Sequence, residues 1–172
     1  MRTISIFCKS IVILLVAGLS INKATAQTTN IEQITKVYDI TPSGSLHIKS
    51  ERSDIEILKW DRNEVKVVGE LTYKGDGSQE DFNKLLNAFK NMNVESSKDV
   101  VKLDLILIVS AVSHNMTPSR KMVTETVLCN GDKISINAIN IKTAYTIWMP
   151  ETLALYIDNK NGNLKIEKEL RK

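Results

Sequence analysis

The amino-acid sequence predicts a mainly β protein, a domain of stacked β-sheets on which one amphipathic α-helix packs. Three observations point to this fold class. The apolar residues are mostly isoleucine, valine and leucine with few aromatics, a composition that favours strands. Apolar and polar residues alternate along much of the chain, and one strand–turn–strand pattern occurs twice. A single segment, at about residues 79–91, has helical spacing instead.

The first 26 residues have the features of an export signal. Arg2 and Lys9 supply positive charge, and residues 11–21 form an apolar run. Ala24-Thr25-Ala26 has the small-x-small pattern of a cleavage site, so we expect cleavage before Gln27. The apolar run is shorter than the roughly 20 residues that span a membrane, so no membrane span is expected after cleavage. The sequence therefore predicts export to the periplasm, the outer membrane surface or the medium.

Removal of the signal leaves residues 27–172, which we expect to form one β-rich domain. Three of the 23 basic residues and none of the 20 acidic residues lie in the signal, so the mature chain has equal numbers of both. A neutral chain offers no basic face for nucleic acid, and we expect no nucleic-acid partner. Cys8 leaves with the signal, so Cys129 has no internal disulfide partner, and we expect its thiol to be buried and inert.

Strict alternation predicts the strands. Within residues 63–74, Val65, Val67 and Leu71 point to one side and charged residues to the other, which is typical of a half-buried strand. The two repeated units, described below, supply four more strands. The remaining expected strands are residues 31–40, 99–110, 122–128, 133–141 and 144–149.

Turns are expected between these runs. Asn130-Gly131 predicts a tight hairpin turn, because glycine accepts the positive φ that such a turn requires. Residues 74–78 contain two glycines and predict another turn, and residues 113–120 predict a polar loop. Along residues 99–110 one face is apolar throughout, while the other becomes apolar halfway. We expect that strand to start at an exposed edge and continue into a region covered on both sides.

The helix follows from apolar residues that recur at i, i+3, i+4, i+7 and i+10. Ser78 is placed to cap its first turn, and Asp81 is placed to complete a capping box. We expect the apolar stripe to pack on a sheet, with a membrane-binding or partner-binding face as the alternative. The stripe consists of Phe82, Leu85, Leu86, Phe89 and Met92.

The repeated pattern is a strand, a polar turn and a second strand. Its apolar residues keep a constant offset and the same parity, and the two turns have equal length. We expect two structurally equivalent layers that stack, with the other strands and the helix inserted between them in sequence. Chance agreement of two hairpin-like units is the alternative. The first copy has Leu46, Ile48, Ile55 and Ile57, and the second has Leu155, Ile157, Leu164 and Ile166.

These segments resemble a family of exported bacterial envelope proteins of unknown function that are classed as adhesins and are common in Gram-negative bacteria. The resemblance rests on Trp60-Asp61 after a strand pair, on Val65-Lys66-Val67, on Ile147-Trp148-Met149-Pro150 and on the second repeat, and it covers most of residues 31–168. It implies a right-handed β-solenoid, a role at the cell surface and no catalytic motif.

The chain departs from this pattern in two places. Ser53 stands where the turn usually has glycine, and the sequence stops soon after Ile166, where relatives continue with further strand–turn units. The charged end could blunt an open strand edge. The alternative is an exposed C-terminal edge that self-associates.

The sequence contains no recognisable catalytic or cofactor-binding pattern. His47 and His114 lie far apart, and Ser113 beside His114 does not make a triad. No phosphate-binding glycine loop and no zinc-ligand spacing occurs, so we expect no enzyme activity, no cofactor and no metal.

The functional prediction is a non-enzymatic, exported envelope protein that makes adhesin-like surface contacts with envelope or cell-surface components. The alternative is a periplasmic module that binds a glycan or another small ligand. Trp60 and Trp148 are the candidate contact residues for a ligand or partner, since an exposed indole can stack on a sugar. A purely structural role for both indoles is the competing interpretation.

Overall fold

The computed structural model describes residues 29–116 and 121–170, so the expected export signal lies outside it. The described chain is mainly β with one helix, which confirms the coarse fold class. In chain order the elements are β1 (Asn30–Asp39), β2 (Ser45–Glu51), β3 (Ser53–Trp60), β4 (Glu64–Gly77), α1 (Gln79–Lys90), β5 (Asn93–Ser96), β6 (Val100–Asp104), β7 (Ile108–Met116), β8 (Lys121–Leu128), β9 (Lys133–Pro150), β10 (Ala154–Lys160) and β11 (Leu164–Leu170).

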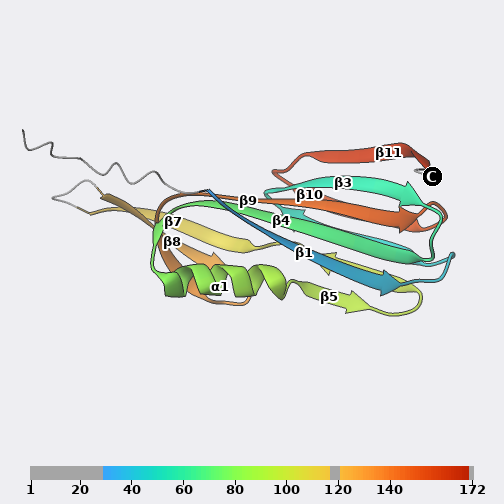
Figure 1. The fold of residues 1–172 in the computed structure, drawn as a ribbon, viewed down its shortest axis with the longest axis horizontal. Helices are drawn as coiled ribbons and strands as arrows, with labels where there is room; N and C mark the ends of the chain where they lie inside the picture. Colours follow the sequence, from blue (N-terminus) through green and yellow to red (C-terminus); the bar gives the residue numbers. More distant parts are fainter. Residues whose placement is uncertain (1–28, 117–120, 171–172) are drawn as a thin grey trace, which may run out of the picture.

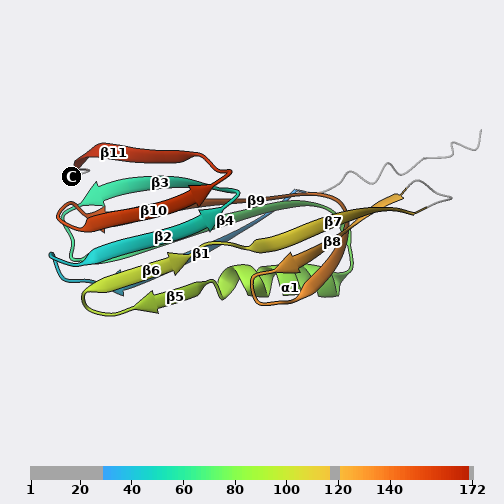
Figure 2. The ribbon, with the colours of Figure 1, turned by 180° about the vertical axis from the view of Figure 1, so that it is seen from behind.

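The strands form two sheets that face each other. Sheet A has the order β1-β4-β9-β3-β11, and the hairpin of β7 and β8 joins it through β9. Sheet B has the order β10-β2-β6-β5. Figure 1 shows sheet A from its outer side. Figure 2 views the molecule from the opposite side and shows the four strands of sheet B from their outer side, with α1 beside β5 in the same layer. No helix in the described residues is long and apolar enough to cross a membrane.

Helix α1 continues the layer of sheet B and packs on the long strands of sheet A. Leu85 and Phe89 are buried, and the Phe89 ring lies 6.3 Å from that of Tyr145 on β9. The Asp81 N–H donates to the Ser78 hydroxyl at 3.0 Å, and that hydroxyl donates to the Asp81 carboxylate at 2.7 Å. The predicted helix, its cap and its core-facing stripe are confirmed.

Residues 99–110 are not the single strand that the sequence predicts. They form β6 in sheet B and the start of β7 in sheet A, and residues 105–107 cross between the layers. The Ile106 N–H donates to the Asp104 carboxylate at 3.3 Å, a local bond that replaces a ladder bond and ends β6. Leu105 and Leu107 are both buried along the crossing, so alternation continues although the strand does not.

Strands β4 and β9 are longer than expected. The turn predicted at residues 74–78 is wrong, because β4 continues to Gly77 with only a register shift between Lys74 and Asp76. The expected strands 133–141 and 144–149 are one strand, β9. The two strands pair antiparallel from Lys66–Trp148 to Gly77–Ile136, so each supplies the hydrogen bonds that keep the other extended.

The two repeated units stack directly on each other. Strand β10 pairs parallel with β2, and β11 pairs parallel with β3. Equivalent residues are direct partners: Leu155 lies opposite Leu46, and Leu164 lies opposite Ile55. We call β2 with β3 the first rung and β10 with β11 the second rung. The register agrees with two equivalent layers and not with two unrelated hairpins.

The turns of the two rungs share one backbone conformation. Arg52 and Asn161 occupy equivalent positions and have φ of 60° and 58°. The Arg52 N–H donates to the Lys160 carbonyl at 2.7 Å, so one turn lies against the other. Asparagine tolerates this left-handed region, whereas arginine does so at a cost of about 1–2 kcal/mol.

We expect Arg52→Gly to raise the free energy of unfolding by about 0.5–1 kcal/mol, because glycine removes the steric cost and adds some entropy to the unfolded chain. The Arg52–Glu51 ion pair, at 3.7 Å, is exposed and adds little. Urea unfolding followed by circular dichroism measures the change. Asn161→Gly is the matched control and should change stability by less than about 0.5 kcal/mol. Destabilisation by Arg52→Gly would mean that the arginine makes a contact that compensates its backbone.

Candidate functional site

In the part of the chain that the structure describes, no strand covers the outer side of the second rung. Strand β10 is the last strand of sheet B and β11 is the last strand of sheet A, and no described residue pairs with their outer edges. Leu164 is 44% exposed and Ile166 is 46% exposed, whereas their first-rung equivalents Ile55 and Ile57 are 3% and 0% exposed. We call this surface, made by β10, β11 and their inward-facing apolar side chains, the open end.

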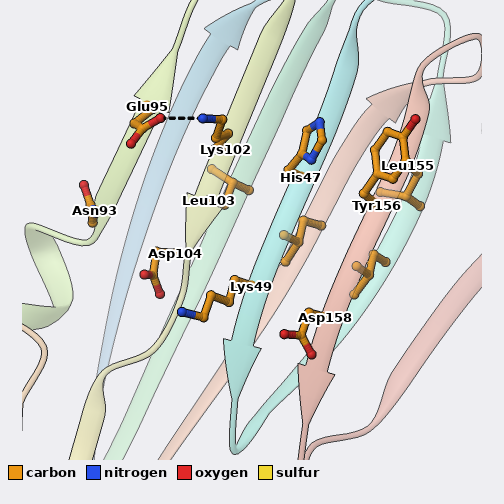
Figure 3. Close-up of a pocket in the computed structure, with 12 residues that line it drawn as sticks. His47, Lys49, Asn93, Glu95, Lys102, Leu103, Asp104, Leu155, Tyr156 and Asp158 are labelled. Carbon is orange, nitrogen blue, oxygen red and sulfur yellow. Dashed lines mark hydrogen bonds and ion pairs between the residues drawn. The ribbon is translucent and has the colours of Figure 1, made fainter.

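Polar side chains make a second surface, on the outer face of sheet B. Strand register places them in two rows that run across the four strands. The rows line a groove of about 650 Å³, which we call the sheet B groove (Figure 3). The first row is Tyr156, His47, Lys102 and Glu95, and the second row is Asp158, Lys49, Asp104 and Asn93.

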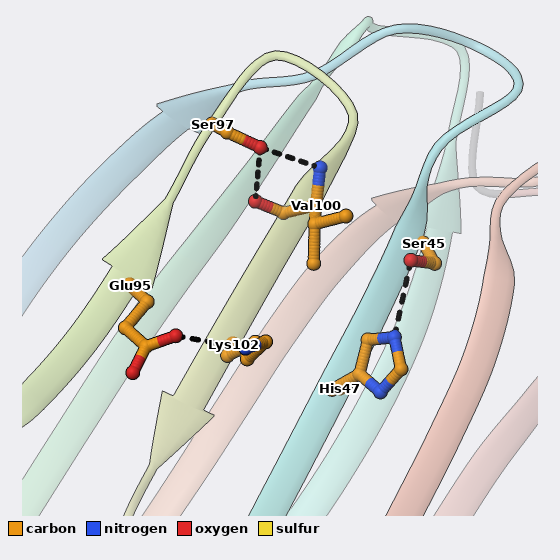
Figure 4. A network of polar contacts seen from close by, with 6 residues as sticks. All are labelled: Ser45, His47, Glu95, Ser97, Val100 and Lys102. Atoms are coloured by element: carbon orange, nitrogen blue, oxygen red, sulfur yellow. Dashed lines mark hydrogen bonds and ion pairs between the residues drawn. The ribbon is translucent and has the colours of Figure 1, made fainter.

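An aromatic pair forms one end of the first row. The rings of His47 and Tyr156 stack with their centroids 4.5 Å apart and their planes 15° apart. The hydroxyl of Ser45 lies 3.1 Å from His47 Nε2 and fixes the imidazole (Figure 4). Tyr156 is 56% exposed, so the pair presents a rigid and accessible aromatic surface.

An ion pair forms the other end of this row. The Lys102 ammonium donates to the Glu95 carboxylate at 2.8 Å, and this hydrogen bond lowers the pKa of Glu95. Beyond it, Ser97 closes the β5–β6 turn, since its hydroxyl accepts from the Val100 N–H at 3.1 Å (Figure 4). Hydrogen bonds therefore fix side chains at both ends of this row, in the aromatic pair at one end and in the ion pair at the other.

The predicted contact residues, Trp60 and Trp148, are brought together, but away from both surfaces. Their rings lie 6.3 Å apart, and Trp60 Nε1 donates to the Glu64 carbonyl at 2.8 Å. Arg62 lies 5.2 Å from the Trp60 ring, and Lys66 lies 4.9 Å from the Trp148 ring. A sugar that stacked on the covered face of either indole would first have to displace a cation. Both indoles stay candidate contacts.

The two histidines and the cysteine lie on three separate parts of the fold. His114, expected in a polar loop, instead lies in β7 opposite Val123. The expectation that Cys129 is buried is wrong, because this residue is exposed on the turn at Gly131. Its Sγ lies 4.0 Å from the Ala88 carbonyl oxygen, and desolvation raises the pKa of the thiol. Among the side chains that the structure describes, no group of three or more His, Cys, Asp or Glu could hold a metal ion.

Sequence reasoning did not identify the sheet B groove. His47 alternates with the buried Leu46 and Ile48 and so lies on the outer face of its strand, but its partners come from strands distant in sequence. The available signal was the outward parity of Tyr156 and His47 in the two repeats, since equivalent positions of stacked strands are neighbours.

Comparison of the sequence with protein-family models, with curated proteins and with solved structures finds no match in any of the three.

Proposed function

We propose that this protein is a non-enzymatic, adhesin-like contact module of the bacterial cell envelope, exported by residues 1–26 and acting through the open end. The proposal includes a β-solenoid organisation, of which the two rungs are successive turns. Support comes from the leader pattern and from the parallel, in-register stacking of the repeats.

The observation that carries the proposal is the difference in exposure between equivalent side chains. Ile57 is fully buried, whereas Ile166, its stacking partner, is 46% exposed on an edge strand. Leu164 is exposed to a similar extent. The open end therefore has the shape and chemistry of a surface that another rung would cover. An exposed apolar row beside unpaired backbone groups is a typical site for addition of a strand from a partner.

The occupant that fits is an extended strand–turn–strand segment from an envelope partner, with apolar side chains at alternate positions. The chain itself provides a probe of this chemistry, a peptide of residues 154–166, because that segment already stacks on the first rung in register. Self-association through the same edge would be a special case, in which the partner is a second copy.

We expect the double variant Leu164→Lys, Ile166→Lys to weaken binding of this peptide, labelled with a fluorophore, by at least about tenfold. Two ammonium groups would be placed where an added rung buries apolar side chains, and lysine discourages edge pairing. Fluorescence anisotropy measures peptide binding. Sedimentation of the exported protein with cell envelope fractions measures the contact in its expected compartment.

Lys165→Ala is the matched control, since Lys165 lies on the same strand but pairs outward with Glu56 at 2.6 Å. It should leave both readouts unchanged. A wild-type protein that stays monomeric, ignores the peptide and does not sediment with envelope fractions would refute the proposed function, as would a double variant that behaves like wild type.

A further inference from the structure

The sheet B groove differs in kind from the open end, because it is built from side chains alone. Its central strands, β2 and β6, are paired on both sides, so their backbone groups are used within the sheet. A ligand lying in the groove finds no free main-chain ladder and cannot bind by strand addition. Recognition there must come from the two rows of side chains.

The charges of the groove nearly cancel. Three carboxylates and two ammonium groups line it, and Lys102 is already paired with Glu95. Such a surface creates no strong field of either sign, which disfavours polyanions such as nucleic acids or acidic polysaccharides. It favours a ligand without net charge.

The second row offers donors and acceptors in alternation. Lys49 lies between Asp158 and Asp104 in the register, and Asn93 follows Asp104. The Lys49 ammonium has no carboxylate within ion-pair distance in the described part of the chain, and its side chain is exposed. Hydroxyl groups, which both donate and accept, match such a row.

The first row adds an apolar surface of fixed orientation. Tyr156 and His47 come from neighbouring strands, as Figure 3 shows, and their rings stack on each other, so each ring covers one face of the other. Tyr156 is 56% exposed and keeps its second face accessible. A flat aromatic group beside a few polar groups is the usual composition of a small-ligand site. Together, an aromatic surface and a row of alternating donors and acceptors complement the apolar and hydroxylated faces of a sugar ring.

We propose that the sheet B groove binds a neutral oligosaccharide that lies across the strands, with one sugar ring against the uncovered face of Tyr156 and hydroxyl groups on Lys49, Asp104 and Asn93. The four strands span about 14 Å, which gives the ligand an extended rather than a compact footprint. This site is separate from the open end and does not depend on the proposed contact function.

The test is a glycan array with neutral, amino-containing and acidic oligosaccharides, followed by titration of the ¹⁵N-labelled protein with the neutral oligosaccharide that binds most tightly. Cellohexaose and chitohexaose are included as linear neutral probes. We expect binding to neutral members, with amide shifts confined to β2, β6, β5 and β10. Tyr156→Ala and Lys49→Ala should each weaken binding by about tenfold, a loss that one aromatic contact or one charged hydrogen bond accounts for. Both side chains are exposed, so neither variant should unfold the domain.

The matched control is the Leu164→Lys, Ile166→Lys variant, which should keep glycan binding while losing the peptide of residues 154–166. Loss of peptide binding at the open end should therefore leave glycan binding in the sheet B groove unchanged. Lys49 lies on an internal strand, so Lys49→Ala should weaken glycan binding and leave peptide binding unchanged. The inference is overturned if no neutral oligosaccharide on the array binds, if acidic glycans bind more tightly than neutral ones, or if both groove variants bind like wild type. Amide shifts confined to Trp60 and Trp148 would also overturn it and would place the glycan on the tryptophan pair.

Discussion

Ile57→Ala should lower the free energy of unfolding by about 2–5 kcal/mol, the range for removing a large aliphatic side chain from a packed core. Ile57 is fully buried in the first rung, between Ile147 on β9 and Ile166 on β11. Ile147 belongs to β9, which is paired on both sides, and cannot move into the cavity. Urea unfolding with a two-state analysis measures the loss.

The second rung supplies a control with identical chemistry. Ile166→Ala removes the same atoms from the equivalent position, but Ile166 is 46% exposed and packs on one side only. We expect the free energy of unfolding to fall by about 1 kcal/mol or less, since much of this side chain is already in contact with water in the folded protein. Equal losses at the two positions would mean that the open end is covered in solution, whether by a second copy or by another segment.

The repeat shows how much of this fold could be predicted from sequence. The offset between Leu46 and Leu155 predicted their stacking, because equivalent positions of parallel strands become direct neighbours when the register is exact. The helix followed from an apolar stripe that only one face of a helix can produce. The helix prediction succeeded because it depends on the local period of one segment, and the stacking prediction succeeded because the same pattern occurs twice in the sequence.

Other features depend on pairing between distant segments, which no local period records. Residues 99–110 keep one apolar face throughout, yet they change sheets at residues 105–107, because that face points into the core that the two sheets share. The glycines at 75–77 predicted a turn, but pairing with β9 keeps them extended. The sheet B groove was missed for the same reason, since Lys102 and His47 become neighbours only through the β2–β6 pairing.

Polar contacts between the rungs follow the same offset of 109 residues. Ser50 donates to Asn159 at 2.6 Å, and Asn163 donates to the Asp54 carboxylate from its backbone N–H at 3.0 Å and from its side chain at 2.8 Å. A slip of one residue would break these contacts and turn the apolar rows to the wrong face. The side chains therefore set the register as well as the pairing.

The two rungs lie close together at Gly162, and Gly162→Ala should destabilise the domain by about 3 kcal/mol or more. A Cβ at this position would lie 1.9 Å from the Ser53 carbonyl oxygen and 2.7 Å from the carbonyl carbon. Both are backbone atoms of β3, which is itself held by β9, so neither chain can move aside without breaking the parallel pairing. Urea unfolding measures the loss, and limited proteolysis of the second rung shows whether it detaches locally before the domain unfolds.

Two further variants separate this backbone clash from a general sensitivity of the turn. Lys160→Ala changes an exposed residue of the same segment and should have almost no effect. Ser53→Gly removes the side chain opposite Gly162 but keeps the carbonyl group, so it should not rescue Gly162→Ala. Ser53 also exchanges a buried hydrogen bond of 2.6 Å with Thr143, so the single Ser53→Gly variant should itself lose stability. If Gly162→Ala proved neutral, or if Ser53→Gly restored it, the two rungs could not be as closely stacked as their register requires.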